Sequence, residues 1–187
     1  LKHCEGMLKE GQPIQVKSVT AEMGNLTKTA GFVAEEKKWM VHEWQDVEDW
    51  SAVFLTFTDG TKATIFANDI TLGGVVNTVD IYLSNSIVKC KMSGMDACEV
   101  YAPASDVFGD EYLREKQETK AGWSLPAPDE DWMRGYPQEM QDFMECFSEG
   151  REPTAGGQLG LEVVQVTYAS YVSAEEGRRV ELEDLED

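Results

Sequence analysis

The sequence predicts an α+β fold, with an open, largely antiparallel sheet and helices packed on one face of it. Apolar and polar residues alternate in several short runs up to about residue 102, as in strands, whereas helical spacing dominates after residue 137. A chain in which the strands come first and the helices come last is typical of α+β domains. The chain has 187 residues, 42% of them hydrophobic, so we expect residues 1–187 to form a single domain with a sizeable core.

The strands are expected in order along the first part of the chain. Residues 14–23 form the first, directly after Gln12-Pro13. Residues 53–67 predict a hairpin, because two alternating runs flank Thr58-Asp59-Gly60-Thr61, whose Asp-Gly pair favours a tight turn. Further strands are expected at residues 79–83, 87–92, 98–102 and, as a final edge, 179–182, which gives a sheet of about six to eight strands.

Two polar regions separate these elements. Residues 24–49 predict a long loop or irregular strands, and residues 103–136 a second loop with a short helix near 107–116. The first region contains His42, Glu43 and Asp46, whose side chains can bind divalent metals, but the spacing is nonspecific and no metal site is predicted. The acidic residues are dispersed and no D-x-D-x-D-G loop occurs, which argues against a calcium-binding protein.

The first long helix is expected to begin at Pro137 and to end at Gly150. Proline suits the first helical position, and Glu139 in the first turn is favoured by the helix dipole. The apolar residues of this helix repeat at helical spacing and predict a stripe that faces a core: Met140, Phe143, Met144 and Phe147.

The second long helix is expected at residues 158–176, before Gly177. Its apolar residues occupy most of the circumference and leave only a narrow polar stripe, so the helix should be covered on two sides. On the sheet, Phe54, Phe66 and Tyr82 are apolar where a solvent-facing side should be polar. A second apolar face indicates subunit pairing or a domain contact, and the alternative is that the long loops cover it.

Charge and cysteine usage restrict the partners and the compartment. The formal net charge is -19, from 35 acidic and 16 basic residues, which argues against nucleic acid and anionic membranes as partners. No apolar run approaches the roughly 20 residues needed to span a bilayer, and the sequence shows no basic-then-apolar pattern typical of a signal peptide before the expected domain. The cysteines show no regular framework, which suits a reducing, cytoplasmic location.

One cysteine pair allows two interpretations. Cys90 and Cys98 lie symmetrically about Gly94, so a hairpin turning there would place them opposite each other. A cross-strand disulfide is one alternative, and two buried free thiols are the expected one.

A string of glycines, prolines and arginines in the two helices resembles the C-terminal end of the glucose-fructose oxidoreductase and myo-inositol dehydrogenase (Gfo/Idh/MocA) family. The matching residues are Glu139, Phe143, Gly150-Arg151, Pro153, Ala169, Tyr171, Ser173-Ala174, Gly177-Arg178, Val180 and Leu182. Val47-Glu48-Asp49 also resembles the family's step into its sheet. The resemblance extends over about residues 11–182 and implies a homo-oligomer formed through the sheet face.

The resemblance also implies a function for individual residues. His3 is similar to the family's proton-transfer histidine, although the residues that normally precede that histidine are absent. The connection before the helices borders the family's substrate cleft, which implies substrate-binding roles for residues suited to a sugar or polyol: Trp123, Trp132, Arg134 and Tyr136.

The chain lacks the family's cofactor and catalytic motifs. It has no G-x-G-x-x-G turn, no E-K-P triplet and no Ser/His/Asp or Cys/His arrangement. The resemblance therefore implies the substrate-binding and oligomerisation half of an NAD(P)-dependent oxidoreductase, inactive alone, whose NAD or NADP is bound mainly by an upstream Rossmann domain. The start at Leu1 rather than Met agrees with a piece of a longer protein. The alternative is a stand-alone, non-catalytic ligand- or partner-binding module. Such a module would not depend on a cofactor, whereas the oxidoreductase would.

Overall fold

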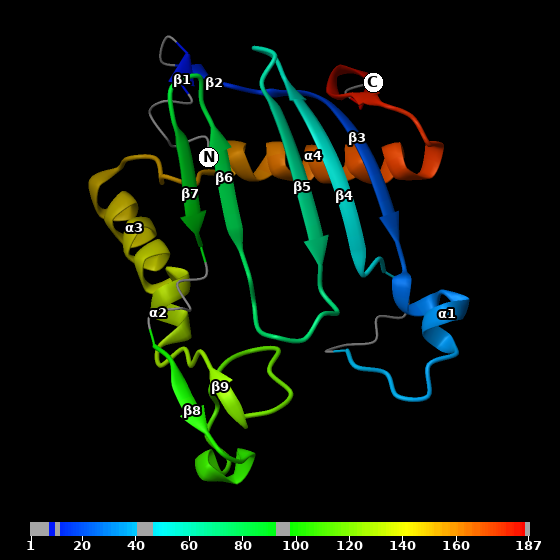
Figure 1. Ribbon diagram of the computed structural model, residues 1–187. Helices are drawn as coiled ribbons and strands as arrows, with labels where there is room; N and C mark the ends of the chain where they lie inside the picture. The colour runs from blue at the N-terminus through cyan, green and yellow to red at the C-terminus, as the bar shows by residue number, and fades with distance from the viewer. Residues whose placement is uncertain (1–7, 10–11, 41–46, 93–97, 186–187) are drawn as a thin grey trace. The chain divides into compact units, whose positions relative to one another are not determined.

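The computed structural model describes residues 8–9, 12–40, 47–92 and 98–185. These residues form two compact units (Figure 1). The first unit holds the described residues of 1–38, 42–70 and 152–187, and the second holds those of 39–41 and 71–151. Each unit is described by itself below. Every strand pairing is antiparallel, and the predicted α+β class with an open sheet is confirmed.

The first unit is built on a four-stranded sheet with the order β10-β3-β4-β5. Its strands are β3 (Val16–Gly24), β4 (Trp50–Phe57), β5 (Lys62–Asn68) and β10 (Val180–Glu181). A small two-stranded sheet, β1 (Leu8–Lys9) with β2 (Gln12–Pro13), precedes it, and a 3₁₀ turn at Leu182–Leu185 follows it. Val19 pairs with Leu55 on one side and with Val180 on the other.

The hairpin of β4 and β5 forms as predicted, because its turn is satisfied locally. The Asp59 carboxylate accepts a hydrogen bond of 2.9 Å from the Thr61 N–H, and the Phe57 carbonyl accepts one of 3.0 Å from Gly60. Gly60 has φ +90°, a conformation that glycine adopts without a steric penalty. The expected final edge strand is also present as β10.

Helix α4 (Gly157–Glu176) covers one face of this sheet (Figure 1). The buried residues between the sheet and the helix form the core of the unit: Val19, Val53, Leu55, Ala169 and Val180. The expectation that α4 is covered on two sides is wrong for the described residues, since several of its apolar side chains are exposed, namely Leu161, Val163, Val164 and Tyr168. The reason is that the small residues Ala169, Ser170 and Ser173 form the side that approaches the sheet.

Residues 24–49 contain more regular structure than predicted, in a 3₁₀ turn at Leu26–Lys28 and the short helix α1 (Ala30–Val33). This region is held by the buried Asp49, which accepts hydrogen bonds from the Leu26 N–H at 2.7 Å, the Thr27 N–H at 3.1 Å and the Thr27 hydroxyl at 2.7 Å. Burial by itself raises the pKa of Asp49, but these hydrogen bonds outweigh it and hold the pKa below its ordinary value. Asp49 therefore fixes the chain where it enters β4. The candidate metal ligands at residues 42–46 lie outside the described residues.

The second unit contains two separate hairpin-like sheets rather than an extension of the first sheet. They are β6 (Thr78–Tyr82) with β7 (Ile87–Lys91), and β8 (Val100–Ala102) with β9 (Gly122–Ser124). The prediction of a single sheet of six to eight strands is therefore wrong for the described residues, whose strands form one four-stranded sheet and three two-stranded sheets. The physical cause lies in the turn before β6, where Gly73 and Gly74 both donate to the Lys116 carbonyl at 3.0 Å and have φ values that only glycine adopts readily.

The prediction of a short helix near residues 107–116 is wrong. The chain forms only a 3₁₀ turn at Ser105–Phe108, which Gly109 ends with φ +51°. Lys116 has φ 60°, in the left-handed region, which is incompatible with continuation of a right-handed helix.

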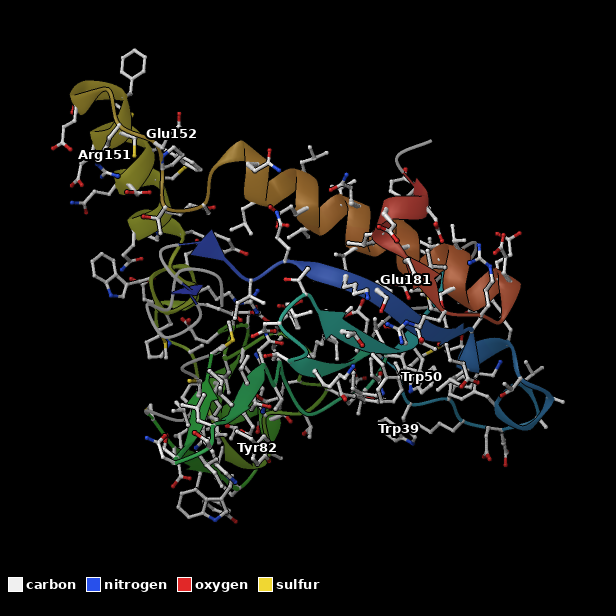
Figure 2. All side chains as sticks on the ribbon, turned by 90° about the horizontal axis from the view of Figure 1, so that it is seen from above. Trp39, Trp50, Tyr82, Arg151, Glu152 and Glu181 are labelled. Atoms are coloured by element: carbon white, nitrogen blue, oxygen red, sulfur yellow. The ribbon has the colours of Figure 1, made fainter. Side chains whose placement is uncertain are left out.

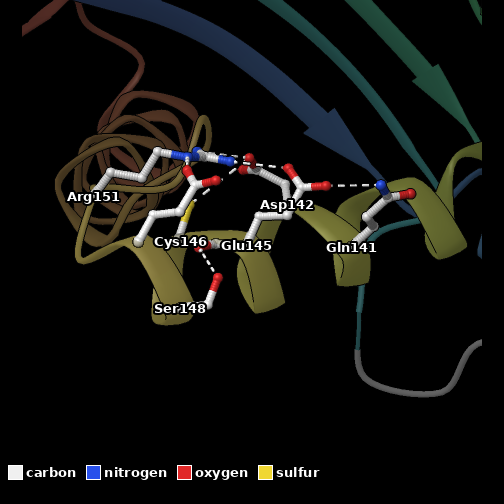
Figure 3. A network of polar contacts seen from close by, with 7 residues as sticks. Gln141, Asp142, Glu145, Cys146, Ser148 and Arg151 are labelled. Atoms are coloured by element: carbon white, nitrogen blue, oxygen red, sulfur yellow. Dashed lines mark hydrogen bonds and ion pairs between the residues drawn. The ribbon is translucent and has the colours of Figure 1, made fainter.

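Helices α2 (Glu130–Arg134) and α3 (Tyr136–Glu149) follow, and α3 agrees with the predicted boundaries. The prediction that the stripe of α3 faces a core is wrong for the described residues, because Met140, Phe143, Met144 and Phe147 are exposed and Phe147 is 88% exposed. The side of α3 that contains the buried Cys146 instead faces an ion-pair cluster (Figure 3). Arg151 contacts Asp142 at 2.9 Å, Glu149 at 3.0 Å and Glu145 at 3.3 Å, which places a cation at the helix C-terminus.

Candidate substrate-binding site

The structure places the four predicted substrate-binding residues in the second unit. Trp123 lies on β9, Trp132 and Arg134 lie on α2, and Tyr136 is the first residue of α3. The predicted proton-transfer residue His3 lies outside the described residues. The identity of all five as functional residues remains a prediction.

A short helix and a glycine turn position three of these side chains. Asp129 caps α2, since its carboxylate accepts a hydrogen bond of 3.0 Å from the Trp132 N–H. Gly135, with φ +88°, ends α2 and precedes α3, so the two helices are separated between Arg134 and Tyr136.

Arg134 is held by two carboxylates. Its Nη2 atom lies 2.6 Å from Glu115 Oε2 and 2.6 Å from Glu130 Oε1. The hydrogen bond to Glu115 is the largest cause that raises the pKa of Arg134, with contributions from the charge of Glu130 and a hydrogen bond to Tyr136. Arg134 therefore orients its neighbours, and its charge is already compensated within the protein.

The network continues to a tyrosine that the sequence analysis did not select. The Tyr112 hydroxyl donates a hydrogen bond of 2.7 Å to Glu130 Oε2. Burial, followed by this hydrogen bond and the charge of Glu130, raises the pKa of Tyr112 to about 12. Tyr112 is thus a protonated hydrogen-bond donor at neutral pH. The Glu130–Arg134 spacing of four residues is a helical ion-pair signal that sequence inspection can find, whereas Tyr112 and Glu115 carry no such signal.

The aromatic residues of the site expose large faces. Trp123 is 74% exposed and pairs across the β8–β9 ladder with Tyr101, the ring centroids lying 5.5 Å apart with a tilt of 58°. Trp132 is 60% exposed. No ring contact joins Trp123 to Trp132 or Tyr136 in the part of the chain that the structure describes. Exposed aromatic faces of this kind stack on the apolar faces of sugar rings.

Covalent and metal chemistry each place requirements on the cysteines and possible metal ligands of the described residues. The Cys146 thiol is buried, and burial raises its pKa, which makes it a poor nucleophile. Cys90 and Cys98 are free, as expected, although Cys98 is exposed rather than buried. Among the described residues, no three His, Cys, Asp or Glu side chains converge as a metal site requires.

The first unit carries an apolar surface on the face of its sheet opposite α4. Phe54 and Phe66 are exposed there, and the ring of Trp50 contacts that of Phe66 edge-on at a centroid distance of 5.9 Å. Figure 2 shows Trp50 on the side of the sheet away from α4. Tyr82, which was expected on the same face, lies on β6 in the second unit, because β6 does not join this sheet. We call Trp50, Phe54 and Phe66 the outer sheet face.

No helix within the described residues is long and apolar enough to cross a lipid bilayer.

The described strands form no parallel strand–helix–strand unit, since every pairing is antiparallel. A dinucleotide is normally bound at the end of such a parallel unit. The described residues therefore contain no parallel unit of the kind that normally binds a dinucleotide.

Comparisons with known proteins identify the class of domain. Residues 11–182 match the family described as "Oxidoreductase family, C-terminal alpha/beta domain". The chain therefore belongs to this family, and the resemblance to Gfo/Idh/MocA proteins is confirmed.

Solved structures share the fold. GenD2 from gentamicin A biosynthesis, in complex with NAD, is 25% identical with a TM-score of 0.68, over 89% of this chain and 42% of GenD2. Scyllo-inositol dehydrogenase from Lactobacillus casei, with bound NAD(H) and scyllo-inositol, is 13% identical with a TM-score of 0.62, over 92% of this chain and 44% of that one.

Myo-inositol 2-dehydrogenase from Lactobacillus plantarum is 15% identical with a TM-score of 0.60, over 92% and 44% of the two chains. This chain thus spans less than half the length of each matched structure. The comparison with the curated proteins found no match.

Proposed function

We propose that residues 1–187 form the substrate-binding and oligomerisation domain of an NAD(P)-dependent oxidoreductase that acts on a sugar, a polyol or a related hydroxyl compound. The observation that carries this proposal is the family match over residues 11–182, together with the coverage of only 42–44% of the matched structures. Domains of this family function beside a cofactor domain, so the proposal assigns the recognition of substrate to this chain.

The side chains of the second unit support the recognition of a hydroxyl compound. Trp123 and Trp132 offer exposed ring faces, and the Tyr112–Glu130–Arg134 network fixes the short helix that carries Trp132. A ring that stacks on a tryptophan and donates hydroxyl hydrogen bonds to nearby carboxylates is typical of sugar binding. Arg134 and Tyr136 complete the proposed group of substrate-binding residues, and His3 is the proposed proton-transfer residue.

The outer sheet face supports oligomerisation. Trp50, Phe54 and Phe66 place aromatic surface on the side of the sheet that α4 does not cover. Two copies of this face, related by a two-fold axis, would each bury the other's aromatic side chains, as in isologous dimers. The proposed occupant of the face is therefore a second copy of the chain.

The cofactor belongs to the proposed upstream Rossmann domain. NAD or NADP would supply hydride chemistry when bound there. The proposal is supported by the described strands, which form no parallel strand–helix–strand unit of the kind that normally binds a dinucleotide. The proposed location is the cytoplasm, where such cofactors and free cysteines occur. Neither nucleic acid nor a membrane is a proposed partner, because the net charge of -19 repels anionic surfaces.

The substrate part of the proposal is tested by calorimetric titration of the chain with myo-inositol and D-glucose. We expect saturable binding that Trp132→Ala weakens about tenfold, the effect of losing one aromatic stacking contact. Trp39→Ala is the matched control, since Trp39 is exposed and lies outside the predicted site. Binding that both variants retain unchanged would remove the assigned role of Trp132.

A further inference from the structure

Arg114 is a buried arginine without an ion-pair partner in the described structure. It is only 8% exposed. The other arginines, Arg134, Arg151, Arg178 and Arg179, each contact at least one carboxylate. No described carboxylate lies within ion-pair distance of Arg114, although the chain carries 35 acidic residues. A buried charge is costly unless a counter-charge compensates it, so Arg114 is the exception that needs a partner.

The position of the guanidinium is fixed by the backbone around it. A Cβ atom added to Gly74 would lie 1.9 Å from Arg114 Nη2, so the guanidinium rests directly against this glycine. Gly74 has φ +91° and donates to the Lys116 carbonyl at 3.0 Å, which ties the turn to the segment that carries Arg114. The Ala127 N–H donates to the Leu113 carbonyl at 2.8 Å and anchors the same segment from the other side. The backbone at Gly74 and the hydrogen-bonded segment around Leu113 therefore hold the Arg114 side chain in place. We call this surrounding backbone the cradle of Arg114.

The hydrogen-bonding capacity of this guanidinium is largely unused. Its only hydrogen bond within the described residues runs from Nη2 to the Val75 carbonyl at 3.4 Å, which is long. Nε is enclosed and has no acceptor. Nη1 makes no hydrogen bond to the described residues and is not among the buried atoms without a partner. The edge formed by Nη1 and Nη2 is therefore the side of the guanidinium that a carboxylate would use. A guanidinium presents parallel N–H groups on that edge, which match the two oxygens of a carboxylate.

The second unit contains two further buried polar atoms without hydrogen-bond partners among the described residues. They are Gln117 Oε1 and Ser124 Oγ. Gln117 Oε1 accepts hydrogen bonds, and the Ser124 hydroxyl both donates and accepts them. A ligand that carries hydroxyl groups as well as a carboxylate supplies the matching donors and acceptors.

We propose that Arg114 binds the carboxylate of a small hydroxy acid of the sugar-acid class. The inference deepens the proposed function and rests on it for the hydroxyl-bearing part of the ligand, whereas the carboxylate part rests on Arg114 and its cradle. A monoanion fits better than a phosphate dianion, because the strongly acidic chain disfavours a second negative charge. The same field makes adventitious anion binding elsewhere on the chain unfavourable.

The test compares D-glucuronate with D-glucose, which share a ring and differ in the carboxylate. Calorimetric titrations of the chain at matched ionic strength are expected to show that glucuronate binds at least about tenfold more tightly, as for one charge-assisted hydrogen-bonded pair. Arg114→Gln is expected to remove this preference. Arg179→Gln changes the net charge by the same amount at an exposed arginine of the first unit and is expected to keep it.

Each result decides between the two proposals. Equal affinity for the two sugars in the unaltered chain, or a preference that Arg114→Gln retains, would overturn the carboxylate site while leaving the proposed function in place. An Arg114-dependent affinity for glucuronate without any affinity for glucose or myo-inositol would support the carboxylate site and contradict the neutral-polyol part of the proposed function. If circular dichroism shows that Arg114→Gln is unfolded, Arg114→Lys replaces it, since lysine keeps the charge but lacks the fork, and the preference should still fall.

Discussion

Ser173 Oγ on α4 accepts a hydrogen bond of 2.9 Å from the backbone N–H of Ala21 on β3, and it donates one of 2.5 Å to the Arg178 carbonyl. Ser173 is fully buried, and one hydroxyl thus joins the helix, the central part of the sheet and the turn that leads into β10. The approach of α4 to the sheet depends on this small polar side chain as well as on the apolar core.

Ser173→Ala should reduce the free energy of unfolding by about 1–3 kcal/mol, because it leaves the partly buried Ala21 N–H and Arg178 carbonyl without this partner. Urea denaturation followed by circular dichroism measures the change. Ser148→Ala is the control, since Ser148 lies exposed on α3 and bonds only within its own helix, and its effect should be within about 0.5 kcal/mol. Equal effects of the two substitutions would contradict the assigned role of Ser173.

Asp49 should make stability depend on acid pH. Its pKa is lower in the folded chain than the ordinary value of 3.8, so the unfolded chain binds a proton more readily. The contribution of Asp49 is therefore present above pH of about 4 and is lost as the pH falls through the folded-state pKa. Asp49→Asn should abolish this part of the acid dependence, whereas Asp106→Asn, at an exposed aspartate, should leave it unchanged. Identical pH profiles for Asp49→Asn and the unaltered chain would disprove the prediction.

Tyr112 should ionise about two pH units later than a free tyrosine. Its pKa is raised to about 12, so the stability that its hydroxyl contributes is present below pH 10 and is lost as the pH rises through 12. In a spectrophotometric titration, the phenolate absorbance that appears at the highest pH should be missing from Tyr112→Phe. Glu130→Gln should move that component to lower pH, because it removes the carboxylate beside the hydroxyl. A late component that persists in Tyr112→Phe would assign it to another tyrosine.

The outer sheet face should control the oligomeric state. Phe54→Asp places a charge among Trp50 and Phe66 and should convert an oligomer into a monomer in sedimentation equilibrium. Phe147→Asp is the matched control, because Phe147 is also an exposed phenylalanine but lies on α3. Dissociation by Phe147→Asp and not by Phe54→Asp would locate the interface on α3 instead.

Local signals explain which elements the sequence predicts. The β4–β5 hairpin depends on Asp59 and Gly60, which lie within the turn itself, and the end of α3 depends on Gly150 with φ +68°. The division into separate sheets depends on a hydrogen bond between Gly74 and Lys116, which are distant in sequence. Apolar spacing on α3 predicts an amphipathic helix, but it does not say which surface covers the stripe, and the described residues leave it exposed.

The candidate site shows the same limit. Trp123, Trp132, Arg134 and Tyr136 were selected because the family resemblance placed them near a substrate cleft. Sequence alone does not reveal that Arg134 is compensated by Glu115, which is 19 residues away, or that Arg114 has no such partner among the described residues. Charge pairing between loops is a property of the folded chain, since it depends on backbone turns that bring remote residues together.

The central claim is tested most directly by the reduction of NAD+ or NADP+ by the native gene product in the presence of sugars, polyols and sugar acids. We predict that the full-length protein reduces one of these cofactors with at least one such compound, and that residues 1–187 alone do not. Failure of the full-length protein to reduce either cofactor with any of these compounds would contradict the assignment to a dehydrogenase, and a non-catalytic binding module would replace it.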